Sequence, residues 1–130
     1  MVILAFLYST CGSPCVVIAQ QIRGALDELS RPVPVLIVSV DRRADAPTNI
    51  HRFLAAVSLS GRARYLSGSA TQLRAVWHGY HVKLPSAGRA AFARSAPVYL
   101  IDRAGDERVL YELEQLTPES VSHDVRKLLG

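Results

Sequence analysis

Residues 8–17 read YSTCGSPCVV and hold the only two cysteines of the chain. Glycine, serine and proline separate Cys11 from Cys15, so the pair has the spacing C-x-x-x-C. The apolar run at residues 2–7 leads into this stretch and predicts a buried strand. Apolar residues at helical spacing follow it, and Pro14 suits the first turn of a helix, where a missing N–H costs nothing. The cysteines are therefore predicted to lie where a strand passes into a helix.

Strands and helices are predicted to alternate along the rest of the chain. Continuous or alternating apolar residues predict strands at residues 2–8, 35–40, 63–66, 98–101 and 108–111. Apolar residues at helical spacing and helix-start signals predict helices that begin at Pro14, Pro47, Ser69 and Thr117. Ser69 with Gln72 three residues later is a capping-box pattern. Residues 81–93 show no period and are expected to form a loop or an insertion.

The predicted order is βαβαβα, then a β-hairpin, then a helix. Alternating strands and helices imply a parallel sheet with right-handed crossovers. We therefore expect an α/β fold with a central, mostly parallel sheet, a C-terminal β-hairpin and helices on both faces. This is the plan of a thioredoxin-like fold, and 130 residues suit one such domain over residues 1–130.

Composition excludes several classes of protein. The net charge is +4, but the basic residues are scattered and only 7% of residues are aromatic. A nucleic-acid partner would require clustered basic residues, so none is expected. No apolar stretch approaches the roughly 20 residues that a membrane-spanning helix needs. The first residues lack the basic segment of a signal peptide, so any targeting segment or anchor would lie upstream.

The position of the two cysteines points to thiol chemistry. Functional groups gather at the carboxyl ends of strands in an α/β sheet. Cys11 is expected just ahead of the helix N-terminus and Cys15 in its first turn, where the helix dipole stabilises a thiolate. Such a pair can bind a soft cation such as Cu(I), close a disulfide or exchange with other thiols. The alternative is a pair of small buried residues, and Cys15 fits that alternative better than Cys11.

Four segments resemble one known family. The stretch FLYSTCGSPC at residues 6–15 resembles the C-x-x-x-C segment of the SCO/SenC family of thioredoxin-like copper proteins. VSVDRRADAP at 38–47 resembles its "SVDPxxDTP" segment, with Arg42 in place of proline and Ala46 in place of threonine. YLSGS at 65–69 is similar to its "LTG" segment, and VYLIDRAG at 98–105 is similar to its "YLIDPxG" hairpin.

The resemblance implies a function. Members of the family help to assemble the copper site of cytochrome c oxidase, by delivering Cu(I) or by reducing thiols of the oxidase subunit. They usually do so from a membrane anchor outside the cytoplasm. Cys11 and Cys15 are the implied copper ligands and redox-active thiols. The implied partner is the copper-receiving oxidase subunit or another thiol protein, and an extracytoplasmic location is expected.

The sequence departs from the family in two places. Family members add a histidine ligand shortly before the "YLID" strand, and that position holds Arg94. An arginine stays protonated and has no lone pair to offer a metal. A cation there would instead favour redox chemistry at the cysteines, unless Arg94 is an ordinary surface residue. The family also carries an N-terminal β-hairpin before the first core strand, whereas this chain starts at that strand.

The four histidines differ as substitutes for the missing ligand. His78 lies just before residues 81–93 and His81 begins this segment, which could fold back towards the cysteines. The alternative is that both are ordinary polar residues at a helix end. His51 and His123 are expected on exposed helix faces and are poor candidates.

Two further residues have two interpretations each, and a third has one. Asp41, at the end of the second strand, either acts on the thiols or caps the following turn. Pro97 precedes a strand, as does the cis-proline that faces the thiols of thioredoxins, but most X–Pro bonds are trans. Trp77 has helical spacing from Leu73 and Tyr80 and is expected in the core.

Three functions are therefore in competition. The first is a copper chaperone of the SCO/SenC type that holds Cu(I) between Cys11 and Cys15. The second is an enzyme, a thiol-disulfide oxidoreductase in which Cys11 attacks and Cys15 resolves, and which does not bind copper. A peroxidase that uses Cys11 is a weaker form of the second. The third is a scaffold that has kept its cysteines and lost its activity. Arg94 weakens the first function and leaves the second intact.

Overall fold

The computed structural model describes residues 1–85 and 88–130. The strands are β1 (Val2–Leu7), β2 (Val35–Ser39), β3 (Ala63–Leu66), β4 (Val98–Ile101) and β5 (Glu107–Tyr111). The helices are α1 (Ser13–Glu28), α2 (Pro47–Ala56), α3 (Ala70–Gly79), α4 (Arg89–Ser95) and α5 (Pro118–Leu129), with a 3-10 turn η1 (Leu113–Gln115). Every predicted strand, and each of the four predicted helices, is present.

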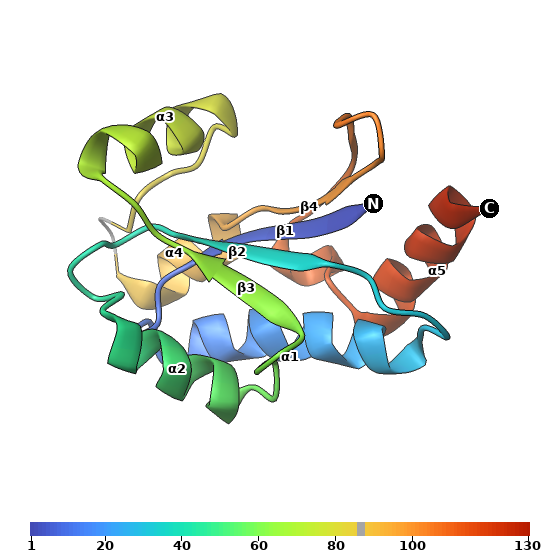
Figure 1. The fold of residues 1–130 in the computed structure, drawn as a ribbon, viewed down its shortest axis with the longest axis horizontal. Coiled ribbons are helices and arrows are strands. Elements are labelled where there is room, and N and C mark those ends of the chain that lie inside the picture. Colours follow the sequence, from blue (N-terminus) through green and yellow to red (C-terminus); the bar gives the residue numbers. More distant parts are fainter. Residues whose placement is uncertain (86–87) are drawn as a thin grey trace.

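All five strands form one sheet in the order β3-β2-β1-β4-β5. The strands β1, β2 and β3 are parallel, and the hairpin β4–β5 joins β1 in antiparallel orientation. The helices α1 and α2 lie on one side of the sheet and α3 on the other (Figure 1). The expected α/β fold, with its C-terminal hairpin and with helices on both faces, is confirmed.

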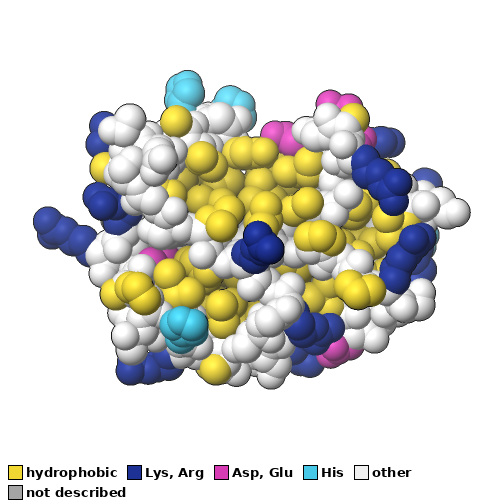
Figure 2. All heavy atoms as spheres, in the orientation of Figure 1, with side chains coloured by type: hydrophobic (Ala, Val, Ile, Leu, Met, Phe, Trp, Pro, Cys, Tyr) yellow, Lys and Arg dark blue, Asp and Glu magenta, His cyan; other side chains and the backbone are white. Residues whose placement is uncertain are grey.

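Alternate residues of the strands face the two helical layers. On one face, the ring of Phe6 in β1 packs against the ring of Tyr80, which follows α3, with 5.5 Å between the ring centroids. On the other face Phe53 of α2 packs edge-on against Tyr65 of β3 at 6.1 Å. Hydrophobic side chains also occupy much of the surface in the middle of the view in Figure 2, while most Lys and Arg side chains lie toward its rim. The central strands β1 and β2 are nevertheless almost entirely buried.

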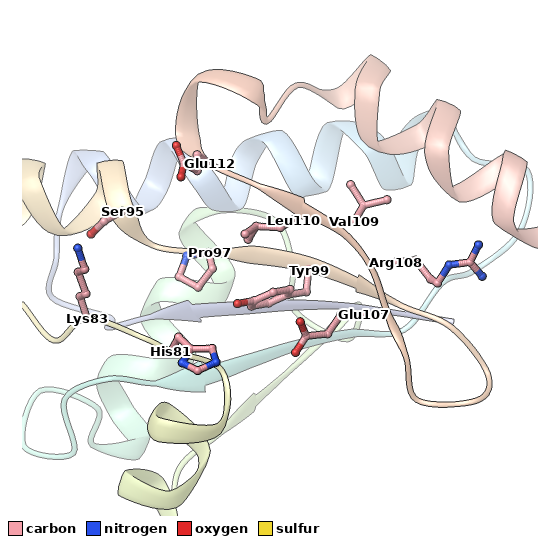
Figure 3. Close-up of a pocket in the computed structure, with 10 residues that line it drawn as sticks. All are labelled: His81, Lys83, Ser95, Pro97, Tyr99, Glu107, Arg108, Val109, Leu110 and Glu112. Atoms are coloured by element: carbon pink, nitrogen blue, oxygen red, sulfur yellow. The ribbon is translucent and has the colours of Figure 1, made fainter.

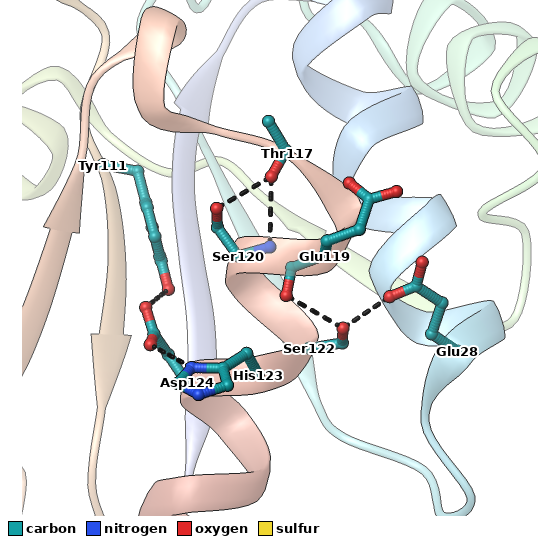
Figure 4. A network of polar contacts seen from close by, with 8 residues as sticks. All are labelled: Glu28, Tyr111, Thr117, Glu119, Ser120, Ser122, His123 and Asp124. Carbon is teal, nitrogen blue, oxygen red and sulfur yellow. Dashed lines mark hydrogen bonds and ion pairs between the residues drawn. The ribbon is translucent and has the colours of Figure 1, made fainter.

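The helix α5 is fastened to α1 and β5 by polar contacts (Figure 4). The Thr117 Oγ1 caps α5 by accepting the Ser120 N–H at 3.0 Å. The Ser122 hydroxyl donates to the Glu28 carboxylate of α1. The Tyr111 hydroxyl of β5 donates to Asp124 at 2.5 Å. Burial of Tyr111 raises its pKa most, and the hydrogen bond to Asp124 raises the pKa further. These contacts fix the end of α1 that lies opposite the cysteines.

A glycine allows α1 and α5 to approach each other closely. A Cβ on Gly24 would lie 2.8 Å from Cγ of Pro118, which is too close for two carbon atoms. We expect Gly24→Ala to destabilise the protein by about 1 kcal/mol, because overpacking outweighs the better helix propensity of alanine. Gly79→Ala is the matched control, since nothing lies within 4 Å of its Cβ position. Urea unfolding that gives equal midpoints for the two variants would contradict the close approach.

The segment 81–93 differs from its expected form. Residues 89–93 belong to α4, a helix of 7 residues that buries Phe92 and Ala93. A helix this short shows too few apolar repeats for its period to be recognised. The rest of the segment has no regular structure in the part that is described, and the expectation for residues 86–87 lies outside the described residues. The peptide bond before Pro97 is trans, so the likeness to the thioredoxin cis-proline is wrong.

Candidate functional site

The two cysteines form a disulfide at the N-terminus of α1. Cys11 and Cys15 are bonded to each other, with their Cα atoms 5.7 Å apart. Cys11 lies ahead of the helix and Cys15 in its first turn, as predicted. Both residues are fully buried. Burial agrees with the alternative of two small core residues, and the bond between them shows that the two sulfur atoms are close enough to pair.

The backbone between the cysteines makes a tight turn. The Cys11 N–H donates to the Tyr8 carbonyl at 3.1 Å, and the Val16 N–H donates to the Gly12 carbonyl at 3.1 Å. Gly12 is the N-cap of α1 and has φ of 81°, a left-handed value that residues with a Cβ rarely adopt. Glycine at this position therefore allows the strand to turn into the helix within the span of the disulfide.

A buried carboxylate holds the turn that leads to Cys11. Asp45 is 4% exposed. Its carboxylate accepts the Ser9 N–H at 2.6 Å and the Tyr65 hydroxyl at 2.9 Å. Burial, and then the neighbouring Asp45, raise the pKa of Tyr65, which therefore remains a donor. Asp45 thus ties the loop after β2 and the strand β3 to the residues just before Cys11.

Sequence reasoning did not single out Asp45. Asp45 could have been found from the resemblance to the "SVDPxxDTP" segment, because that segment has an aspartate at the same position. The sequence pointed to Asp41 instead, as a residue that either acts on the thiols or caps the turn, and the structure supports the cap. Its Oδ1 accepts the N–H groups of Arg43 and Ala44 at 3.1 and 3.2 Å, so Asp41 caps the turn after β2.

The helix α4 lies beside α1 and brings an unforeseen cation to the site. The ring of Phe92 packs against Tyr8 with 5.5 Å between centroids. Arg89, the first residue of α4, places its Nη1 atom 3.5 Å from the position that a Cβ on Gly12 would occupy. The positive charge that was considered for Arg94 is therefore supplied at the turn by Arg89. Arg94 is an exposed residue in the last turn of α4.

The candidate histidines do not complete a metal site in this structure. His81 lines an open surface cavity of about 560 Å³ with residues of the β4–β5 hairpin (Figure 3), and no cysteine lines that cavity. His78, His51 and His123 are exposed on helices. Within residues 1–85 and 88–130, no three His, Cys, Asp or Glu side chains are grouped so that they could hold a metal ion. Of the residues that the sequence predicted as ligands, the structure brings together only Cys11 and Cys15, which can offer two thiolates only after reduction.

Trp77 was expected in the core and lies instead at its edge. It is partly buried, and its indole N–H donates to the Ser39 carbonyl at the end of β2 at 2.8 Å.

Among the helices that the structure describes, none is long and apolar enough to cross a membrane.

Comparison with known proteins identifies relatives along the full chain. The sequence model of the SCO1/SenC family matches residues 1–130. Comparison with curated proteins gives no significant match. Similar solved structures include copper-bound ScoI of Arabidopsis thaliana, with a TM-score of 0.78 and 18% identity over 98% of this chain and 82% of that one. Copper-bound yeast Sco1 has a TM-score of 0.79 and 17% identity, over 98% and 77% of the two chains.

A third structure concerns the redox state of such a protein. It is that of BsSco, described as having a disulfide switch and as a member of the Sco family of cytochrome c oxidase assembly proteins. Its TM-score is 0.78 and its identity 19%, over 98% of this chain and 78% of that one. These similarities confirm the fold of the chain.

Proposed function

The chain belongs to the SCO1/SenC family, and on that premise we propose that it assists assembly of the copper site of cytochrome c oxidase through Cys11 and Cys15. The observation that carries the proposal is the disulfide between these residues at the N-terminus of α1. The same pair can hold Cu(I) when reduced or exchange electrons with thiols of a partner.

The geometry favours thiol-disulfide exchange over a three-ligand copper carrier. Arg94 occupies the position where the family resemblance implies a histidine, and the described residues offer no substitute group of three ligands. Two thiolates alone are suited to Cu(I), which accepts two-coordinate sulfur ligation. We therefore propose that exchange with a thiol partner is the main activity, and that any copper carried by this protein is held by the two thiolates.

The exchange reaction balances without a cofactor. Both cysteines are fully buried in this structure, so the turn must open locally before the bond can be attacked. A partner dithiol then attacks the Cys11–Cys15 bond, forms a mixed disulfide and closes its own disulfide. Two electrons and two protons pass from the partner to the cysteine pair. In the reverse direction the reduced pair reduces a disulfide of the oxidase subunit and thereby prepares its thiols for copper.

We place this activity outside the cytoplasm. The support is family membership together with a similar structure that is described as a SCO1/SenC family lipoprotein from Bacillus anthracis. That protein shares 19% identity with this chain, with a TM-score of 0.75. The proposed partner is the copper-receiving oxidase subunit or another thiol protein.

A Cu(I) titration separates the two modes of action. The reduced protein competes for Cu(I) against a chelator of known affinity, with Arg94→His measured in parallel. We expect the natural sequence to bind at least tenfold more weakly than Arg94→His, because only the variant offers an imidazole at that position. Equal and tight one-to-one binding by both proteins would contradict the preference for exchange and would favour a copper chaperone with two thiolate ligands.

A further inference from the structure

We propose that Arg89 is a positioning residue for thiol exchange, which stabilises the negative sulfur released when the Cys11–Cys15 bond is broken. The inference rests on the proposed exchange function. Its starting observation is the approach of the Arg89 guanidinium to Gly12, with Nη1 3.5 Å from the position of an added Cβ. Gly12 lies between the two bonded cysteines, so the cation sits at the turn that the disulfide closes.

The helix α4 holds this cation in place. Phe92 and Ala93 are buried, and Phe92 packs on Tyr8, which precedes the cysteine turn. Arg89 itself is exposed, and in the described part of the chain its side chain takes part in no hydrogen bond or ion pair. Its charge is therefore not paired with an acidic side chain and is available to a charge that develops at the turn.

The chemistry of the exchange step creates a negative charge at this turn. The attacking thiolate forms a bond to one cysteine sulfur while the other sulfur leaves as a thiolate. The partner's second thiolate then attacks the partner sulfur of the mixed disulfide, which closes the partner's own disulfide and releases the first cysteine as a thiolate. A cation beside the turn attracts the incoming thiolate and stabilises the departing one, and the N-terminus of α1 adds its partial positive charge.

The effect of one exposed cation is moderate. For a charge at this range and exposure we expect the rate of disulfide reduction to fall roughly threefold to tenfold when it is removed. The equilibrium with a dithiol should shift toward the disulfide form by a similar factor, because the reduced state loses a favourable charge interaction.

The test uses the whole chain and dithiothreitol as the dithiol, at one fixed pH and low salt. The second-order rate of reduction and the equilibrium constant are measured for the natural sequence, Arg89→Gln and Arg89→Lys. Arg103→Gln removes an exposed arginine from the turn after β4, at the end of the sheet opposite the cysteines, and is the matched control. We expect Arg89→Gln to show the loss, Arg89→Lys to recover most of it, and Arg103→Gln to behave as the natural sequence. High salt should reduce the difference between the natural sequence and Arg89→Gln, because salt screens exposed charges.

Two results would overturn the proposal: equal rates for Arg89→Gln and the natural sequence, or a loss that salt leaves unchanged and lysine does not recover. The second result would assign Arg89 a purely structural role. Failure of the oxidase function is detected separately, by reaction of the reduced protein with a peptide that carries the copper-binding cysteines of an oxidase subunit. If that peptide does not react while the dithiothreitol rates depend on Arg89, the role of Arg89 stands and the oxidase partner does not.

Discussion

Serine at position 11 or 15 is expected to abolish both disulfide exchange and tight Cu(I) binding. Each variant keeps one thiol, which can form a mixed disulfide but cannot close the Cys11–Cys15 bond to release the partner. Each variant also leaves a single thiolate for Cu(I), and the described residues group no further ligands around it. The loss should exceed 100-fold in turnover of a disulfide substrate and in Cu(I) affinity.

Both variants are also expected to lose stability. The disulfide closes a loop of about five residues, for which the chain-entropy estimate is about 2 kcal/mol. The measurements are exchange with a dithiol, Cu(I) competition and urea unfolding. Ser13→Ala changes an exposed residue within the same turn and is the control. Undiminished Cu(I) binding by either cysteine variant would contradict the copper part of the proposal, and undiminished turnover would contradict the exchange part.

The fold was predictable because its signals are local and agree with one another. The strand β1 and the helix α1 follow from a continuous apolar run, a proline at the first turn and apolar residues at helical spacing. The capping box at Ser69 and Gln72 is present with both of its hydrogen bonds. The position of the cysteines then follows from the order of the elements.

The surroundings of the cysteines depend on tertiary contacts that no local pattern announces. Arg89 and Arg94 belong to one short helix, which packs Phe92 on Tyr8 and brings Arg89 beside Gly12. Counting back from β4 led to Arg94, because position along the chain was the one available criterion. Asp45 was overlooked for the same reason, since its partners lie 36 and 20 residues away in sequence.

Asp45 is the second residue whose replacement should have a large effect. Asp45→Ala would leave the Ser9 N–H and the Tyr65 hydroxyl without their acceptor at a buried position. An unsatisfied buried donor costs about 1–3 kcal/mol, so the variant should lose about 3 kcal/mol of stability. Because Ser9 stands two residues before Cys11, the turn should also be less well fixed and exchange should slow by roughly tenfold.

Comparison of three variants separates the two contacts of Asp45. Tyr65→Phe removes only the hydroxyl and leaves the bond to the Ser9 N–H intact, so it should cost about 1 kcal/mol and leave exchange nearly unchanged. Asp45→Asn can still accept one of the two bonds and should fall between Tyr65→Phe and Asp45→Ala. Urea unfolding reports stability, and reduction by dithiothreitol reports exchange. If Tyr65→Phe slows exchange as much as Asp45→Ala, the cysteine turn depends on the packing of β3 and not on the hydrogen bond to Ser9.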